Sequence, residues 1–466
     1  MLFSSIPFLY YFLPIVLITY FVVPGKLKNL VLLTFSLIFY GWGESRYVIL
    51  MAFVIVLGYV LGLLIEKYKS KRYAKLFLYF AILVDLGVLG YFKYADFFIE
   101  NFNSVVKIQI PLLKIALPIG ISFFIFQILS YNIDVYRGAV TAQKNLFYLA
   151  TYVSMFPQLI AGPIVRYIDV EKQLKERIHS VKLAAEGIRR FVSGLAKKVL
   201  VANALGECCA LFKESSDKSI LFFWIYGIAF MLHIYFDFSG YSDMAIGLGK
   251  IFGFHFMENF NYPYISGSIT EFWRRWHISL GSWFRDYVYI PLGGNRVSKF
   301  RWIFNIVVVW FLTGFWHGAA WNFICWGLYF IIFLVIEKFI LMPYLKRARG
   351  WNHLYVLFFV MISFIIFDAS SLQEGVGNIL GLFGLGVEKV ISVESTYYLK
   401  NYFITILVAM IGATPFPKRW YEKIQNTTMG NRILLVTEPL IMIGIFLLVT
   451  AYLVDGSFNP FLYFRF

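Results

Sequence analysis

The chain has 466 residues, of which 60% are hydrophobic and 15% charged, and its formal net charge is +16. Soluble domains average about 45–50% apolar and about 25% charged residues, so this composition excludes a water-soluble, disordered, collagen-like or coiled-coil protein. So much apolar surface needs lipid as its solvent, and the sequence therefore predicts an all-α, polytopic integral membrane protein. The positive charge lies in short loops between apolar runs, which indicates membrane orientation and not a nucleic-acid partner.

In chain order, about eleven apolar runs are long enough to cross a hydrocarbon core of about 30 Å. They lie near residues 8–23, 29–43, 47–65, 76–92, 115–135, 220–236, 302–316, 322–341, 353–367, 400–415 and 433–454. The first run has no basic segment before it and no small-residue cleavage site, so we expect a retained span and not a signal peptide. No linker or internal repeat divides the chain, and a single membrane domain over residues 1–466 is expected.

Three further apolar pieces are interrupted. Residues 146–165 contain Pro157 and Pro163, and residues 187–206 and 240–262 are broken by glycine or charge. Broken backbone at membrane depth is tolerated only where protein or a water-filled cavity covers it. The sequence therefore predicts re-entrant or in-plane helices for these pieces.

The loop charges set an orientation. The loop 66–75 carries five basic residues against one acid, which places it in the cytoplasm and the N-terminus outside. The blocks 166–198 and 271–301 are also basic and are expected inside, whereas the tail 455–466 is expected outside. We therefore expect a multi-pass protein of the cytoplasmic (inner) membrane.

His317 is the most conspicuous ionisable residue, because it lies inside an apolar stretch of about 40 residues. An ionisable side chain at such depth is costly and suggests a function, and histidine is the commonest general base. The small neighbours Gly314 and Gly318 are expected to leave room for a substrate beside the imidazole. The alternative is a structural histidine hydrogen-bonded between helices.

A second histidine, His277, lies in a segment rich in tryptophan and arginine. If the segment is one helix, Trp273, His277, Leu280 and Phe284 share a face. Indole rings beside guanidinium groups suit a phosphate-bearing cytosolic donor, since arginine pairs with phosphate through a forked contact. An interfacial amphipathic helix is the alternative. The candidate donor-binding residues here are Trp273, Arg274, Arg275, Trp276, Arg285 and Asp286.

The other histidines are not expected to have a catalytic role. His233 and Asp237 share a helical face, and a buried, hydrogen-bonded His–Asp pair is expected there; without a third partner it makes no metal site. His179 lies in a charged loop and is given no role. Motifs of serine hydrolases, P-loop ATPases, zincins and dinucleotide enzymes are absent from the sequence.

Five stretches of the sequence together carry a resemblance to a known family. They are Ala161–Tyr167, Phe236–Gly249, Asn261–Tyr264, Phe272–Arg296 and Gly314–Ala319. In this order the chain resembles the membrane-bound O-acyltransferase (MBOAT) family, in its alginate O-acetyltransferase-like branch, with a motif-rich core near residues 160–320. Gly281 and Arg465 depart from the residues commonest there.

The resemblance implies a reaction and assigns residues to it. His317 matches the family's catalytic histidine and His277 its second polar position, and both are expected to be catalytic. Trp316, next to His317, is a further candidate for binding the substrate or donor. An acyl group would pass from a cytoplasmic thioester, expected to be acetyl-CoA, through a central tunnel to a hydroxyl on the far side. No bound cofactor or metal is implied. Tyr463, on the tail expected outside, is either an acyl relay or an aromatic interfacial anchor.

The expected acceptor is an extracytoplasmic polysaccharide or cell-wall polymer, reached with the help of an extracytoplasmic acetyltransferase-like partner protein. Two alternatives stay open at this point. One keeps the mechanism but transfers D-alanine to teichoic acid, or an acyl group to peptidoglycan. The other is a transporter of a lipid-linked glycan, which also uses broken helices and intramembrane polar residues.

Overall fold

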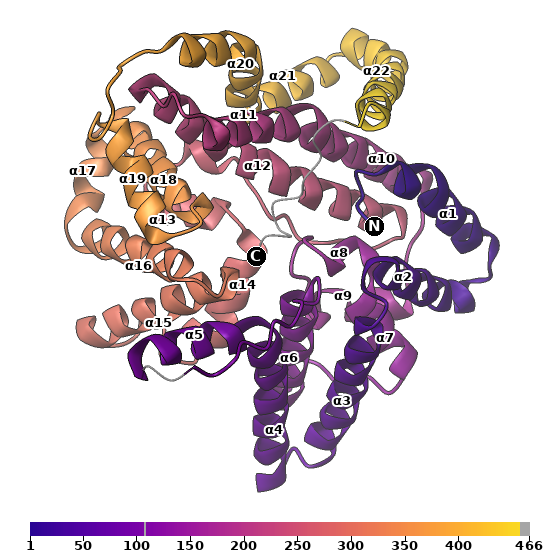
Figure 1. Cartoon of the computed structure of the whole chain (residues 1–466). Helices are drawn as coiled ribbons and strands as arrows, with labels where there is room; N and C mark the ends of the chain where they lie inside the picture. Colours follow the sequence, from indigo (N-terminus) through magenta and orange to yellow (C-terminus); the bar gives the residue numbers. More distant parts are fainter. Residues whose placement is uncertain (107–108, 457–466) are drawn as a thin grey trace. The chain divides into compact units, whose positions relative to one another are not determined.

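The computed structural model describes residues 1–106 and 109–456, and every regular element in these ranges is a helix (Figure 1). This confirms the all-α prediction. The contacts divide the chain into two compact units, Met1–Phe191 with Met244–Met257, and Val192–Asp243 with Glu258–Phe466. We call them unit 1 and unit 2 and describe each by itself. The single domain over residues 1–466 stays a prediction.

Unit 1 contains the N-terminal helices. Within it α3, α4 and α6 pack against one another, and α7 packs against α2 and α3 (Figure 1). The helices are η1 (Pro7–Phe12), α1 (Leu13–Val22), η2 (Gly25–Leu27), α2 (Lys28–Glu44), α3 (Tyr47–Lys67), α4 (Arg72–Leu89), η3 (Gly90–Tyr94), α5 (Ala95–Val106), α6 (Ile121–Arg137), α7 (Leu146–Ser154), α8 (Phe156–Leu159), α9 (Tyr167–Lys175) and most of α10 (Val181–Ala196).

Unit 2 contains the rest of the chain. Within it α15 and α16 form a tightly packed hairpin, and α18 packs on α16. The helices are η4 (Lys197–Ala202), α11 (Asn203–Glu214), most of α12 (Ile220–Ile251), η5 (Pro263–Ile265), α13 (Ile269–Arg275), α14 (Ile278–Phe284), η6 (Arg285–Tyr289), α15 (Lys299–His317), α16 (Trp321–Ile336), η7 (Glu337–Leu341), α17 (Met342–Arg347), α18 (Trp351–Asp368), α19 (Leu372–Leu382), α20 (Val393–Gly412), α21 (Phe416–Gln425) and α22 (Thr428–Val454).

Seven helices among the described residues are long and apolar enough to cross a membrane, or eight if the bent pair α20–α21 forms one span. This confirms a multi-pass membrane protein but gives fewer full-length spans than the eleven expected. Three of the expected runs form shorter helices, Pro7–Val22, α2 and α6, each under the 18 residues of a full span. Apolar composition locates a span, but caps and turns decide the helix length.

The interrupted pieces behave in two ways. In residues 146–165 the chain is broken as expected, because α7 ends at Ser154, the short α8 contains Pro157, and non-helical backbone follows. In residues 187–206 the backbone is not broken, because α10, η4 and α11 form one uninterrupted helical stretch, and an in-plane helix there stays a prediction. The expectation is wrong for the first half of 240–262, because α12 is long and apolar enough to cross a membrane and continues to Ile251.

Glycine explains why α12 continues where a break was expected. In unit 1, a Cβ atom on Gly247 would lie 2.6 Å from the carbonyl oxygen of Gly187 in α10, and a Cβ on Gly187 would equally meet Gly247. The two helices therefore approach each other at backbone distance, which only glycine permits. These glycines shape helix packing and do not end the helix.

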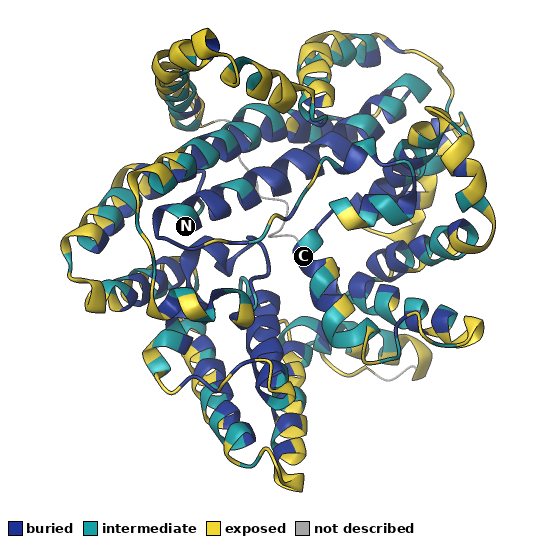
Figure 2. Cartoon of the chain, turned by 180° about the vertical axis from the view of Figure 1, so that it is seen from behind, coloured by how far each residue is buried: buried dark blue, intermediate teal, exposed yellow. Residues whose placement is uncertain are grey.

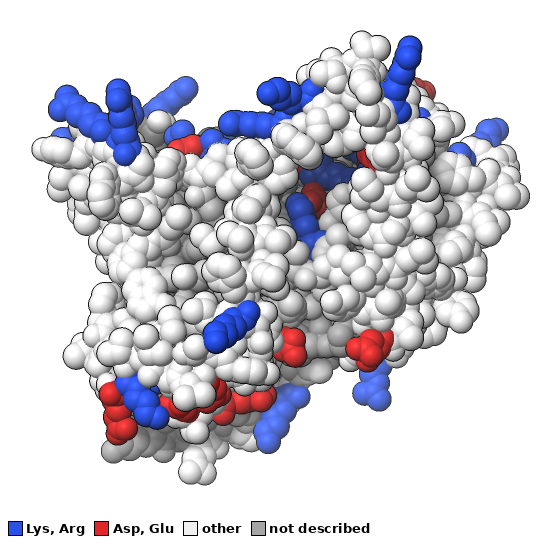
Figure 3. Space-filling view, turned by 90° about the horizontal axis from the view of Figure 1, so that it is seen from above, with Lys and Arg blue, Asp and Glu red and all other residues white. Residues whose placement is uncertain are grey.

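Burial separates the helices inside the protein from those left to lipid. In the span of α12, 78% of residues are buried, against 6% in α22, and Figure 2 shows exposed helices of the latter kind in yellow. Uncharged side chains form most of the surface seen in Figure 3, where many lysine and arginine side chains project at the margins and others lie with acidic side chains within the outline. Such a surface suits a protein solvated by hydrocarbon and bordered by headgroups.

Candidate active site

The α15–α16 hairpin places His317. A Cβ atom on Gly314 would collide with the carbonyl of Phe323, and one on Gly327 would collide with the carbonyl of Trp310, so the two helices touch backbone to backbone. A Cβ on Gly318 would run into the Phe323 ring. The expectation that Gly314 and Gly318 leave room for a substrate is therefore wrong. Protein fills that space, and the glycines let α16 pack against the end of α15.

His317 is the last residue of α15 and is buried, at 7% exposed. Three aromatic rings meet its imidazole nearly edge to face: Trp316 at 4.9 Å, Trp326 at 5.1 Å and Phe367 at 5.3 Å between centroids. Such rings fix the imidazole plane and keep water away from it. The site accordingly has the low-dielectric surroundings in which a polar catalytic group is most effective.

His277 sits at a break in the helix and not inside one. Its φ of 45° is left-handed, and α13 ends at Arg275 while α14 begins at Ile278. A histidine in this conformation is strained, and strained residues of this kind cluster at functional sites. The segment is therefore not one continuous helix, because the chain turns at His277.

A hydrogen-bond network holds His277 in this turn. The Oδ1 atom of Asn259 lies 3.1 Å from His277 Nδ1 and accepts hydrogen bonds from the backbone N–H (3.2 Å) and the hydroxyl (2.9 Å) of Ser279. The Nδ2 group of Asn259 donates to Ser242 Oγ at 3.1 Å. The backbone carbonyl of Asn259 also accepts from the N–H of Ile278 at 2.9 Å.

This network fixes the tautomer of His277. A backbone N–H can only donate, so the amide atom of Asn259 that faces Ser279 is the oxygen. That oxygen can only accept, so Nδ1 of His277 carries the proton and Nε2 carries the lone pair. Burial lowers the pKa of His277 to about 3, so the ring is neutral at physiological pH.

A pocket of about 180 Å³ adjoins His277 in unit 2. A volume of this size holds several water molecules, so it has room for a small acyl group. Apolar and aromatic side chains dominate the wall. From the 273–289 segment they are Trp273, His277, Leu280, Gly281, Phe284, Arg285 and Tyr289, and from α15 they are Ile306, Val309, Trp310 and Thr313.

The four residues expected to share one helical face, Trp273, His277, Leu280 and Phe284, all line this pocket. The break at His277 therefore does not separate them. His317 is not part of the wall, but it follows Thr313 by four residues on α15, which places both on the same side of that helix. Trp273, His277 and Arg285 thus lie at the pocket wall, and His317 lies on a helix that contributes to the same wall.

Trp316 links the two histidines. Its ring lies 4.9 Å from the imidazole of His317 and 6.1 Å from that of His277, between centroids. A second aromatic group, Phe238, meets His277 edge to face at 4.7 Å. A movement of Trp316 would therefore disturb both histidines at once.

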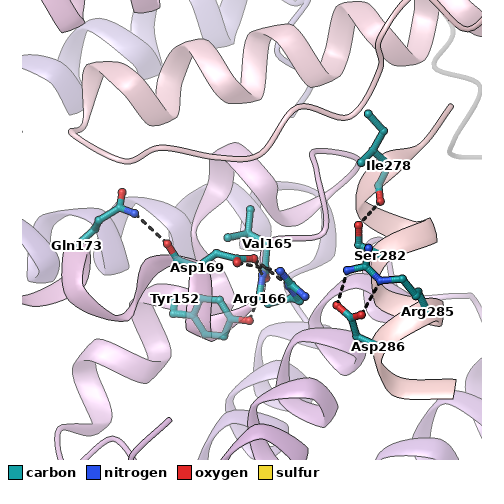
Figure 4. Close-up of polar contacts among 9 residues, drawn as sticks. All are labelled: Tyr152, Val165, Arg166, Asp169, Gln173, Ile278, Ser282, Arg285 and Asp286. Carbon is teal, nitrogen blue, oxygen red and sulfur yellow. Dashed lines mark hydrogen bonds and ion pairs between the residues drawn. The ribbon is translucent and has the colours of Figure 1, made fainter. Parts of the chain in front are cut away.

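The predicted donor-binding arginines are placed differently from one another. Arg285 lines the pocket and forms two contacts with the Asp286 carboxylate, at 2.7 and 3.0 Å (Figure 4). Arg275 pairs with Glu271 at 2.8 Å, whereas Arg274 is exposed. The ring of Trp276 is buried in the core, stacked on Phe272. Trp273 and Arg285 are therefore the two residues of this group that reach the pocket wall.

Other candidates fall elsewhere. The predicted hydrogen bond between His233 and Asp237 is wrong, because Nδ1 of His233 donates to the Ala202 carbonyl at 2.7 Å and Asp237 pairs with Lys198 at 2.7 Å. No group of three or more metal-ligating side chains occurs in the described ranges. Tyr463 lies outside the described residues.

Two residues that sequence analysis missed support the site. One is Asn259, whose partner His277 follows 18 positions later. The other is Glu337, fully buried, whose carboxylate accepts hydrogen bonds from the N–H of Thr270 (2.8 Å) and from its hydroxyl (2.6 Å), at the start of α13. The sequence did hold a signal for Glu337, because it lies inside an apolar run. A charged side chain buried there needs hydrogen-bond donors around it.

The structure is that of a multi-pass helical membrane protein with two buried histidines, one of them in the wall of an aromatic pocket, and comparison with known proteins defines its class. A model of the membrane-bound O-acyltransferase family matches residues 138–373. The chain belongs to this family and is an acyltransferase. Membership also decides against the transporter alternative.

Three relatives show how far the likeness extends. A probable alginate O-acetylase of Azotobacter vinelandii is 42% identical, over 88% of this chain and 84% of its own length. A peptidoglycan O-acetyltransferase of Helicobacter pylori is 34% identical, over 83% and 80%. A teichoic acid D-alanyltransferase of Bacillus subtilis is 30% identical, but only over 47% and 59%.

Proposed function

We propose that this protein transfers an acetyl group from a cytoplasmic thioester, acetyl-CoA, to a hydroxyl group of an extracytoplasmic polysaccharide or cell-wall polymer. One observation supports this proposal above the others: the ring of Trp316 contacts the imidazoles of both His317 and His277. His277 also lines a pocket with room for a small acyl group. The enzyme lies in the cytoplasmic membrane, and an extracytoplasmic acetyltransferase-like partner completes delivery to the polymer.

In the proposed reaction His317 is the general base. It accepts the proton of the acceptor hydroxyl while that oxygen forms a bond to the thioester carbonyl carbon. The carbon–sulfur bond then breaks, and the proton passes from His317 to the leaving thiolate, so the products are an ester and free CoA thiol. A base of this kind contributes about 10²–10⁴-fold to the rate.

The other residues hold the donor. His277 lines the pocket and contacts the bound donor there. Trp273 forms apolar wall for the acyl group and the pantetheine arm. Arg285 lies at the same wall, where its guanidinium can exchange Asp286 for a donor phosphate.

The relatives favour acetyl over D-alanyl transfer. Those named for O-acetyl transfer align with at least four fifths of this chain, whereas the teichoic acid D-alanyltransferase aligns with less than half. A positively charged D-alanyl group would also have to enter a pocket with a mostly apolar wall, at a high desolvation cost. Alginate-like polysaccharide and peptidoglycan remain the two acceptor classes to compare.

Tyr463 is proposed as an acyl relay between the membrane enzyme and its partner. Its phenol oxygen would take the acetyl group as an ester and release it to the final acceptor. Mass spectrometry of protein trapped during turnover should find an acetyl ester on Tyr463, and Tyr463→Phe should lose transfer to the polymer. Full transfer by Tyr463→Phe would end the relay and leave an aromatic anchor.

The experiment that tests the proposed function compares donors and acceptors in sealed proteoliposomes. Acetyl-CoA or a D-alanyl thioester is supplied outside or inside, with an alginate-like polysaccharide or peptidoglycan fragments on the other side. We expect thiol release and polymer labelling with acetyl-CoA but not with the D-alanyl thioester. The acetyl label should cross the membrane to the polymer. Thiol release from the D-alanyl thioester alone would overturn the acetyl assignment.

A further inference from the structure

A cluster of three cationic or titratable side chains lies in unit 1, apart from the proposed active site. It consists of Lys28 at the start of α2, with Arg177 and His179 in the loop that follows α9; we call it the Lys28 cluster. All three side chains are partly exposed and surround the buried ring of Tyr20 near the end of α1. None of them has a role in the proposed reaction.

The geometry around Tyr20 is specific. Lys28 Nζ lies 5.0 Å and Arg177 Cζ 6.0 Å from the centroid of its ring. The Tyr20 hydroxyl donates to the carbonyl of Phe252 at 3.0 Å and lies 2.9 Å from His179 Nε2. Because a hydroxyl has one proton, His179 Nε2 is the donor in the second contact.

The cluster is held in place by protein groups. Arg177 donates through Nη1 to Asn29 Oδ1 at 2.7 Å, and its guanidinium lies 4.5 Å from the ring centroid of Phe254. Gly253 has a φ of +82°, and a Cβ there would lie 3.3 Å from Arg177 Cβ. The chain near Phe252 and Phe254 can therefore approach the loop only because residue 253 is glycine.

The cluster lacks negative charge. In the part of the chain that the structure describes, no Asp or Glu forms an ion pair with Lys28, Arg177 or His179. Burial lowers the pKa of His179, and the neighbouring charges of Lys28 and Arg177 lower it further. Like charges gathered without a counter-charge are unfavourable, and a bound anion would relieve the repulsion.

The surroundings indicate what kind of anion fits. Next to the cluster, apolar side chains are exposed on both segments: Phe21 and Val22 at the end of α1, and Ile178 in the loop with Val181 at the start of α10, the last two above 80% exposed. Charged groups bordered by exposed apolar side chains match a ligand with an anionic head and hydrocarbon tails. A free phosphate would use only the charged half of this surface.

We propose that the Lys28 cluster binds the phosphate of an anionic phospholipid, with the acyl chains lying on the exposed apolar residues beside it. Lys28 contributes a mobile ammonium, and Arg177 contributes a guanidinium already oriented by Asn29. His179 adds a donor group. The site would tie the loop after α9 to the membrane surface.

Native mass spectrometry of the purified full-length protein tests this, with phosphatidylglycerol or phosphatidylcholine added in detergent. Wild type should retain phosphatidylglycerol in preference to phosphatidylcholine. Each basic residue near a membrane surface contributes about 1 kcal/mol, so Lys28→Gln should weaken phosphatidylglycerol retention about fivefold, and Lys28→Gln with Arg177→Gln should weaken it further. Lys26→Gln is the matched control, because Lys26 is exposed and only two residues away.

Several outcomes would overturn the proposal. Unchanged phosphatidylglycerol retention in Lys28→Gln would overturn it. Because Lys28 is partly exposed, this single variant keeps the test valid even if the protein with Arg177→Gln does not fold. Equal retention of the two lipids by wild type would show that charge is not recognised. If inorganic phosphate at millimolar concentration displaced the lipid and raised the unfolding temperature of lipid-free protein, the ligand would be free phosphate and not a lipid.

Discussion

The Nδ1 atom of His277 lies 3.1 Å from Oδ1 of Asn259, and the same oxygen accepts the backbone N–H of Ser279. The backbone N–H of Ser279 sets the orientation of the Asn259 amide, and the amide oxygen in turn sets the tautomer of the His277 imidazole. Asn259 is therefore a positioning residue, which acts on the reaction through His277. Its effect should appear in the protonation behaviour of His277 and not only in protein stability.

Asn259→Asp tests this relationship. A carboxylate beside Nδ1 stabilises the imidazolium, and an opposite charge at this distance raises a histidine pKa by about one to three units. The loss of activity that comes from protonating His277 should therefore move from about pH 3 in wild type toward neutral pH, in addition to the loss from protonating the base His317, which both proteins share. The profile is measured as the rate of CoA release from acetyl-CoA.

Asn261→Asp is the matched control for that prediction. Asn261 is two residues away, and its side chain is exposed. It should leave the pH–rate profile in place. A profile unaltered in Asn259→Asp protein that is folded and active would mean that Asn259 does not set the protonation of His277.

The second prediction concerns the pocket volume. Gly281 lines the pocket, and a Cβ there would meet nothing closer than the Trp273 carbonyl oxygen at 4.0 Å. Gly281→Leu should fold normally but occupy space used by the donor, and kcat/KM for acetyl-CoA should fall about tenfold, or about 1.4 kcal/mol. Gly281→Ser, with a smaller side chain, should stay near wild type. Equal activity of both variants would show that the donor does not enter this pocket.

The third prediction concerns Glu337. Its buried carboxylate accepts two hydrogen bonds from Thr270 at Oε2 and one from the backbone N–H of Ile269 at Oε1, and Gln in its place turns an amide N–H₂ toward the donors of one of these oxygens. Glu337→Gln should cost about 1–3 kcal/mol of stability and should raise KM for the donor, because α13 carries Trp273. Thermal unfolding and steady-state kinetics measure the two effects. The exposed Glu388→Gln should change neither, and an unaltered KM in Glu337→Gln would separate Glu337 from the site.

The fourth prediction is a pH dependence of stability. His277 has a folded pKa of about 3 against about 6.5 when unfolded, so below pH 6.5 the unfolded chain binds a proton that the folded chain does not. Stability from this residue is present above pH 6.5 and declines as the pH falls, by about 2 kcal/mol at pH 5. His277→Gln should lose less stability than wild type between pH 7 and pH 5 in thermal unfolding. An equal loss in both proteins would contradict the assignment.

Some features of this protein could be predicted because they depend on composition or on a single position. The all-helical membrane fold follows from the apolar fraction of the chain. His317 stood out because a lone ionisable residue in a long apolar run is costly. The helical spacing also grouped four residues correctly. The chain breaks at His277, but the side chains on either side of the break still line one pocket wall, and they are Trp273, His277, Leu280 and Phe284.

Other features depend on contacts between distant residues. Asn259 and His277 are 18 positions apart, and nothing local joins them. The glycine at 247 was expected to interrupt a helix, but its role is set by Gly187, which lies 60 positions earlier. In the same way, Asp237 is paired with Lys198 and not with its helical neighbour His233. Tertiary packing overrides local expectation at each of these places.

The central claim is that His317 is the base of acetyl transfer. Purified protein in sealed proteoliposomes is given acetyl-CoA labelled in its acetyl group, and free CoA and label are followed for wild type, His317→Ala and the exposed control His255→Ala. We predict that label leaves CoA with wild type and His255→Ala, and that His317→Ala, folded to the same extent, is slower by about 10²-fold or more. A His317→Ala rate within a few fold of wild type would contradict the account.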